Sequence, residues 1–345
     1  MGATELKTSP GPAAPPNHGA PTTRRNTLLG ILCMSLATMM FAASTAVMKA
    51  EFVRYPIGEV MFSRSLTSLL VCAAIILPTA GWPVFDTKKP KAHFARGLSQ
   101  SISQTFTVFA VGLMPLAGAI AIGFSAPLFS SLISVLWLKE RMDLPRFLAL
   151  IVGFLGVLVV THPGASSLQL GALFALANAV MYGSVTVAVR SMTKTEGTLT
   201  LLMWQLSIVA ALHALLLAFG VKALTLSDAA ALAGGGVAWG VGQYLWTKSL
   251  SLAMTTVVSP FYYLLLVWAM IIGYVVWGDA PSQSLLLGSA IVVLAGLALT
   301  LREARQKSAA AVASAGPHAA PANGRYAPKP IARSASASVL GALKK

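Results

Sequence analysis

Residues 97–138 read GLSQSISQTFTVFAVGLMPLAGAIAIGFSAPLFSSLISVLWL and contain no Asp, Glu, Lys or Arg. A membrane-spanning helix needs about 20 consecutive apolar residues, so this stretch has room for two spans. Four further uncharged stretches cover residues 26–48, 147–189, 197–221 and 249–278. The 345 residues are 56% hydrophobic and only 10% charged, and their mean hydropathy is +0.74. A water-soluble domain of this length could not cover so much apolar surface, so the sequence predicts an all-α polytopic membrane protein.

Proline, glycine and charged residues divide these stretches into ten predicted transmembrane helices. Their expected ranges are 27–48, 57–78, 94–112, 115–137, 145–161, 169–189, 198–220, 228–248, 254–277 and 283–301. The flanking segments 1–23 and 304–345 are rich in Pro, Ala, Ser and Gly and lack a hydrophobic period, so we expect both to be disordered. Cys33 and Cys72 lie in apolar runs, so neither a disulfide nor a thiolate metal site is expected.

The Lys and Arg residues beside the predicted helices indicate the orientation of the chain. With a cytoplasmic N-terminus, fifteen of them fall in inner segments, and only Lys49, Arg54 and Lys222 fall in outer ones. This bias follows the positive-inside rule, so we expect a multi-pass protein of the inner membrane with both termini in the cytoplasm. We expect the basic C-terminal segment 304–345 to contact anionic lipid headgroups, and we predict no nucleic-acid partner.

The second half of the sequence resembles the first. Residues 40–45, MFAAST, align with residues 181–186, MYGSVT, at an offset of 141. Gln104 aligns in the same way with Gln243, at an offset of 139. The sequence therefore predicts an internal duplication.

The predicted repeats are residues 24–161 and 162–303, and each holds five helices. Because five is an odd number, the second repeat must enter the membrane with the opposite polarity, which gives inverted repeats. Inverted repeats are typical of transporters, in which two equivalent halves exchange conformations around a site near the middle of the membrane.

Several short motifs point to a known family. They are MPLAGAIA at 114–121, APL at 126–128, KER at 139–141, GFLGV at 153–157, SPFYY at 259–263 and GDAP at 278–281. With these motifs, residues 27–303 resemble the EamA family of the drug/metabolite transporter superfamily. The motif YPIGEV at 55–60, with Arg64 and with Arg96 before Gly97, is similar to the branch that contains S-adenosylmethionine and riboflavin carriers. The resemblance implies a ten-helix carrier of small organic molecules.

Arg64 lies about seven residues inside the second predicted helix, where an unpaired charge is costly. Its guanidinium must reach the outer interface, pair with Glu59, or face a polar cavity. In the first two cases its role is structural. In the third it anchors a ligand or holds one conformation, and this makes Arg64 the first candidate for substrate binding.

Gln104 and Gln243 are a second candidate feature, because two amides inside the membrane need partners and the repeat places them at matching depth. We expect both to face a central cavity. Trp239, Gln243 and Trp246 stand at i, i+4 and i+7, so one helix face carries two rings around an amide. Such a face suits a flat or amphipathic solute. The alternative is that the amides only join helices through hydrogen bonds.

Other aromatic and polar side chains are predicted to line the same cavity. Asn178 and Tyr182 lie one turn apart in the sixth predicted helix, and Phe41 takes the position equivalent to Tyr182 in the first. Tyr262 and Tyr263 follow a proline in the ninth predicted helix. These five residues complete the predicted substrate-binding set.

Four residues are predicted to act in gating. A proline within a span frees a backbone carbonyl, so Pro127 and Pro260 are candidate hinges, and ordinary packed kinks are the alternative. Glu140 belongs to a charge cluster at the cytoplasmic end of the fourth predicted helix, whereas Asp279 stands alone at the outer end of the ninth. The segment 236–240, GVAWG, predicts a close approach between two helices.

No catalytic constellation is visible, since His93, His162 and His213 lie in different segments and no Gly-rich phosphate loop follows a strand. We predict no enzyme activity, no cofactor and no metal. The leading hypothesis is a secondary active transporter, a monomer or a homodimer, that moves a small metabolite by alternating access. The resemblance suggests S-adenosylmethionine, riboflavin, an amino acid or a related compound. Proton coupling through His213 stays open. The alternatives are a flippase for lipids or lipid-linked sugars, and a non-transporting scaffold or receptor.

Overall fold

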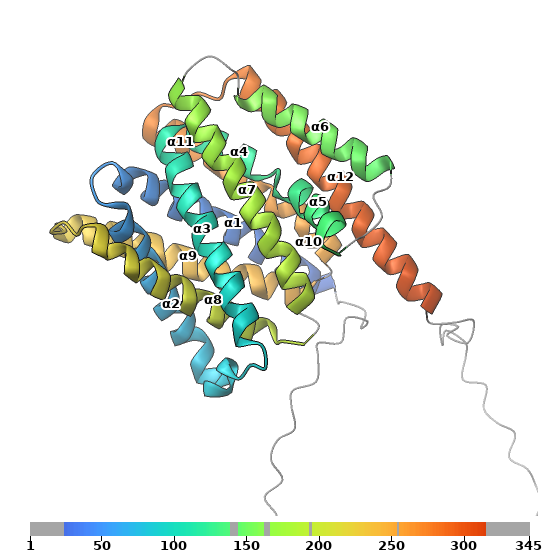
Figure 1. The fold of residues 1–345 in the computed structure, drawn as a ribbon, viewed down its shortest axis with the longest axis horizontal. Coiled ribbons are helices and arrows are strands. Elements are labelled where there is room, and N and C mark those ends of the chain that lie inside the picture. The colour runs from blue at the N-terminus through green and yellow to red at the C-terminus, as the bar shows by residue number, and fades with distance from the viewer. Residues whose placement is uncertain (1–23, 139–143, 162–165, 193–194, 254, 315–345) are drawn as a thin grey trace, which may run out of the picture. The chain divides into compact units, whose positions relative to one another are not determined.

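The computed structural model describes residues 24–138, 144–161, 166–192, 195–253 and 255–314. In this part of the chain every regular element is helical, as Figure 1 shows. The α-helices are α1 (Arg24–Phe52), α2 (Ile57–Ala80), α3 (Pro90–Leu113), α4 (Leu116–Gly123), α5 (Ala126–Leu138), α6 (Leu144–Thr161), α7 (Ser166–Met192), α8 (Thr198–Leu215), α9 (Leu226–Leu252), α10 (Thr255–Tyr262), α11 (Leu264–Trp277) and α12 (Gln283–Ser314). Two short 3₁₀ helices are η1 (Trp82–Phe85) and η2 (Leu216–Phe219).

Within the described residues, six helical stretches are long and apolar enough to cross a membrane. They are Arg24–Phe52, Ile57–Ala80, Leu116–Leu136, Leu170–Val189, Thr198–Phe219 and Pro260–Trp277. Phe147–Val160 and Gln283–Leu299 are shorter apolar helices. Neither α3 nor α9 is among these stretches, because both helices carry many small and polar residues. The predicted all-α polytopic membrane character is therefore confirmed at the level of composition and secondary structure.

Helix pairing brings distant parts of the chain together. The long helix α1 packs along α9, and α3 packs along α7. The α1–α9 pair is antiparallel, since Ser249 near the end of α9 donates to the carbonyl of Gly30 near the start of α1, at 2.7 Å. Near the other end of the pair, the position of Gly235 faces Val47.

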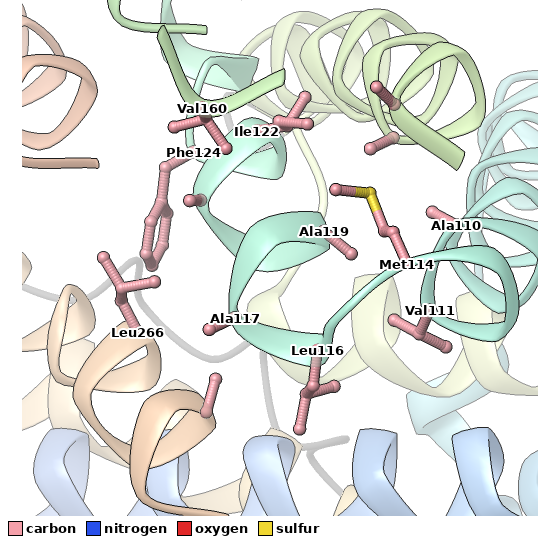
Figure 2. Close-up of a cluster of buried hydrophobic side chains, with 14 of the residues drawn as sticks. Ala110, Val111, Met114, Leu116, Ala117, Ala119, Ile122, Phe124, Val160 and Leu266 are labelled. Atoms are coloured by element: carbon pink, nitrogen blue, oxygen red, sulfur yellow. The ribbon is translucent and has the colours of Figure 1, made fainter. Parts of the chain in front are cut away.

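The largest apolar core surrounds α4. It joins residues at the C-terminal end of α3 to residues of α6, α7, α11 and α12. Figure 2 shows the Phe124 side chain, at the end of α4, lying beside Leu266 of α11, with Ile122 and Val160 near the same end of the helix. This core holds the middle of the chain against its C-terminal helices.

Two helices predicted to be continuous are interrupted. The range 115–137 contains a break between α4 and α5, and the range 254–277 contains one between α10 and α11. At the first break, Pro127 has no N–H to donate to the carbonyl of Gly123. The hydroxyl of Ser125 donates to another carbonyl of this turn, that of Ile122, at 2.7 Å. At the second, the N–H of Tyr263 reaches back only three residues, to the carbonyl of Pro260, at 3.3 Å.

The prediction of disorder from residue 304 onward is wrong for residues 304–314, because α12 continues to Ser314. This stretch contains many Ala, Arg, Gln and Lys residues, which have high helix propensity. Residues 1–23 and 315–345 lie outside the described part of the chain.

Candidate functional site

Arg64 is the centre of the candidate site. It lies on α2 with only 3% of its surface exposed. Its Nη2 donates a hydrogen bond to Oε1 of Gln104 on α3. Its guanidinium carbon lies 4.3 Å from the ring centroid of Trp239 on α9, which is a cation–π contact.

Trp239 also contacts an aromatic residue of α1. The ring centroids of Phe41 and Trp239 are 4.9 Å apart, and the rings are tilted by 50°. Phe41, Arg64, Gln104 and Trp239, from four helices, form one connected group that we call the arginine cluster. Four of the residues predicted to bind substrate therefore meet in space.

Glycines in α9 allow this meeting. A Cβ added at Gly236 would lie 2.6 Å from Cβ of Thr67 and 2.9 Å from the backbone oxygen of Arg64. A Cβ at Gly240 would lie 3.0 Å from the backbone oxygen of Ser68. The hydroxyl of Ser68 donates to the carbonyl of Gly236 at 3.1 Å. The close helix approach predicted from residues 236–240 is confirmed, and it brings Trp239 against the arginine.

The proposed pairing of Arg64 with Glu59 is wrong. Oε2 of Glu59 accepts a hydrogen bond from the backbone N–H of Lys222, at 3.0 Å, and no ion pair of Arg64 occurs in the described part of the chain. The two residues are five apart on α2, so they do not lie on one face as residues three or four apart would. Arg64 is thus buried as a cation bonded to a neutral amide.

Asn178, Tyr182, Tyr262 and Tyr263 make contacts away from the arginine cluster. Oδ1 of Asn178 accepts a hydrogen bond from the hydroxyl of Ser103 on α3, at 2.6 Å. The phenol groups of Tyr182 on α7 and Tyr262 on α10 lie close enough to interact with each other. Tyr262 and Tyr263 both pack on the large core around α4. The described contacts of these four residues are thus made with side chains outside the arginine cluster.

Among the described residues, Trp246 and Gln243 make no hydrogen bond, ring pair or cation–π contact with the arginine cluster. Trp246 packs in a small apolar group with Met34, Ala253 and Val258. Gln243 is half-buried, and within the described residues its side chain has no hydrogen bond. The expected face of two rings around an amide therefore runs from the arginine cluster at Trp239 to an apolar group at Trp246.

The predicted gating residues have different surroundings. Pro127 is the second residue of α5, directly after the first helix break, and Pro260 lies in α10, three residues before the second break at Tyr263. The description of Asp279 as standing alone is wrong, because its Oδ2 lies 3.5 Å from Nζ of Lys49, a contact that a search along one helix could not find. Glu140 lies outside the described residues.

Arg96 is a buried residue that sequence reasoning did not single out for the site. It is 8% exposed, and its guanidinium donates to the carbonyl of Leu201 and to the amide oxygen of Gln205 on α8. A signal for it exists, since four of the buried polar residues of α3 recur at helical spacing. They are His93, Arg96, Gln100 and Gln104. A polar stripe of this kind marks a helix face turned toward other helices.

A hydrogen-bond network at one end of the bundle was also not predicted from the sequence. Arg54 donates to both carboxylate oxygens of Asp228, at 2.7 and 3.1 Å, and the hydroxyl of Tyr55 donates to the same carboxylate. That hydrogen bond to Asp228 raises the pKa of Tyr55, because it stabilises the protonated phenol. The network ties the loop after α1 to the first turn of α9.

The described residues contain no group of three or more His, Cys, Asp or Glu side chains placed to hold a metal ion. The chemistry that the arginine cluster offers is recognition: a guanidinium, an amide and two aromatic rings held at fixed positions by four helices.

Comparison with known proteins gives the family. The model of the EamA-like transporter family matches residues 28–162 and 169–302. An S-adenosylmethionine uptake transporter of Rickettsia bellii is 25% identical over 280 residues, which is 81% of this chain and 96% of the relative. A riboflavin transporter of Vibrio cholerae is 26% identical, over 82% of this chain and 96% of its own. A pseudopaline exporter, CntI, of Pseudomonas aeruginosa is 27% identical, over 79% and 95%.

One solved crystal structure superposes with a TM-score of 0.55 at 21% identity, covering 82% of this chain and 98% of its own, and this likeness concerns the fold alone. The relatives are named as transporters, in agreement with the prediction that the chain is not an enzyme. Both repeats predicted from the sequence contain a match to the family model, and the chain belongs to the EamA-like transporter family.

Proposed function

We propose that the chain is a secondary active transporter that moves a small organic metabolite across the inner membrane by alternating access. In this proposal ten spans form two inverted repeats, with both termini in the cytoplasm. The helix pairs α4–α5 and α10–α11 each count as one interrupted span. The arginine cluster lies at the substrate site, and Asn178, Tyr182, Gln243, Trp246 and Tyr262 line the same path.

Helix packing supports the inverted repeats. The offset of 141 makes α7 the equivalent of α1, and the offset of 139 makes α9 the equivalent of α3. Exchanging the two repeats therefore turns the pair α1–α9 into the pair α7–α3. In the structure α1 packs along α9, and α3 packs along α7. Equivalent pairs are what a two-fold relation between halves requires.

The convergence of four helices on Arg64 is the observation that carries the transport proposal. A buried guanidinium in a membrane helix is costly, and such residues mark substrate or ion pathways. The names of the relatives differ in cargo and in direction. One is an S-adenosylmethionine uptake transporter, one a riboflavin transporter and one a pseudopaline exporter. We therefore propose a metabolite carrier without assigning a direction.

Counterflow in proteoliposomes tests this function. Vesicles holding the full chain and loaded with an unlabelled metabolite should take up the labelled form faster than empty vesicles, for at least one member of a broad panel. Gln104→Ala should lose at least about tenfold in this exchange because it removes the hydrogen bond that positions Arg64. Gln283→Ala, at an exposed position at the start of α12, serves as the matched control.

No exchange with any member of the panel would overturn the transport proposal. Movement of labelled phospholipid between leaflets, without metabolite exchange, would favour a flippase instead. Accessibility of tags at the two termini to an impermeant reagent in intact cells tests the cytoplasmic placement, and labelling of either terminus from outside would contradict it.

A further inference from the structure

Within the described part of the chain, no carboxylate balances the charge of Arg64. The structure describes the side chains of six acidic residues, Glu51, Glu59, Asp86, Glu196, Asp228 and Asp279. Five of them have partners elsewhere, and Asp86 is exposed in a loop. The buried His213 of α8 lies near enough to interact with the Arg64 charge, and an imidazole is neutral or positive. The described surroundings therefore supply no negative charge.

The guanidinium also keeps unused hydrogen-bond donors. It has five N–H groups, of which Gln104 accepts one from Nη2. Nε is buried and has no acceptor within the described residues. A buried charged donor without an acceptor is destabilising, so a ligand that supplies an acceptor to Nε would bind strongly here.

We propose that Arg64 binds an anionic group, a carboxylate or a phosphate, on the transported solute. The inference rests on the proposed function and names its substrate class. A planar carboxylate and a tetrahedral phosphate can each accept two N–H groups of one guanidinium, which fixes the orientation of the anionic group. The Trp239 ring lies against the guanidinium and Phe41 packs against Trp239, so the part of the solute next to the anionic group is aromatic or apolar.

Matched pairs of compounds that differ only in the anionic group test the proposal. Indole-3-acetate with indole-3-acetamide tests a carboxylate, and flavin mononucleotide with riboflavin tests a phosphate. The binding of each compound to the full chain in lipid nanodiscs is measured by thermal shift and by quenching of tryptophan fluorescence. In at least one pair the anion should bind at least tenfold more tightly than its neutral partner. The pair that shows this preference identifies the anionic group.

Three variants separate charge recognition from folding. Arg64→Gln should weaken binding of the anion by about thirtyfold or more, because it removes one partner of a buried ion pair, and should leave the neutral compound unaffected. Arg64→Lys keeps the charge without the planar fork and should retain part of the preference. Lys248→Gln removes an exposed positive charge from α9 and should change neither affinity.

Equal binding of anionic and neutral partners in both pairs would overturn the proposal, as would full preference in a folded Arg64→Gln protein. Exchange in proteoliposomes distinguishes this failure from that of the proposed function. If the protein exchanges metabolites but shows no preference for the anionic member of either pair, transport stands and anion recognition is wrong.

Discussion

The ring of Phe124 packs against the ring of Tyr263, with the centroids 5.0 Å apart and the planes tilted by 58°. Phe124 follows the last residue of α4, and Tyr263 separates α10 from α11. The two are 139 residues apart, the same offset that relates Gln104 to Gln243. The interruptions of the two repeats thus fall at equivalent positions and touch each other.

This contact should be important for stability. Phe124 is 5% exposed, so Phe124→Ala leaves a cavity in the largest core and should lower the free energy of unfolding by about 3–5 kcal/mol. Phe94→Ala is the control, since Phe94 is 53% exposed and its loss creates no enclosed cavity. Thermal unfolding of the purified proteins in detergent measures the difference. Equal losses in the two variants would show that the Phe124–Tyr263 contact adds nothing.

Gly236 should tolerate no larger residue. In Gly236→Ala the new methyl group overlaps Thr67 and the backbone of α2, so the helices must separate at a cost of about 1–3 kcal/mol. The separation also moves Trp239 away from Arg64, so metabolite exchange should fall with stability. Gly234→Ala is a matched control two residues away, because its methyl group would meet nothing within 4 Å. That variant should be more stable than the wild type by up to about 1 kcal/mol, and a loss of stability there as large as in Gly236→Ala would contradict the explanation.

The ion pair between Lys49 and Asp279 should couple the ends of α1 and α11. The Lys49 side chain is only 14% exposed, and its Nζ also lies 3.2 Å from the carbonyl of Met114 and 4.8 Å from the Trp277 ring centroid. Because these contacts fix the lysine, a double-mutant cycle with Lys49→Met and Asp279→Asn should give a coupling energy near the upper end of the range for exposed pairs, about 1 kcal/mol. Chemical or thermal unfolding measures it. Strictly additive effects of the two changes would mean that the pair has no energetic role.

Tyr55 should make stability depend on alkaline pH. The hydrogen bond to Asp228 raises the pKa of Tyr55 above its ordinary value of 10.0 in the folded protein. Below that ordinary value both states hold the proton and the contribution is complete. It is lost as pH rises from the unfolded pKa through the folded one, because the unfolded state ionises first. Thermal unfolding across this range should show a decrease that is smaller in Tyr55→Phe, and an unchanged decrease in that variant would refute the assignment.

Local sequence properties predicted most of the secondary structure. Helix-forming apolar stretches depend on composition and length within one segment, so the expected range 57–78 lies within two residues of α2, Ile57–Ala80. The spacing of Gly236 and Gly240 also predicted a close helix approach, since the requirement for small residues is a property of that face alone. The interruptions after Gly123 and at Tyr263 were not predicted, because an apolar window gives the same signal whether its hydrogen-bond ladder is continuous or broken.

The sequence by itself determined that this chain is a helical membrane protein with a duplicated plan, and it indicated the family, because hydropathy, repeat offsets and motifs are written along the chain. Only the tertiary structure decided which polar groups are partners. Arg64 bonds to Gln104 and not to Glu59, Arg96 bonds to Gln205, and Asp279 meets Lys49. Each partnership joins different helices, and it depends on the rotation and depth of both helices. These are fixed by the packing of all the helices together, so no single segment carries the information.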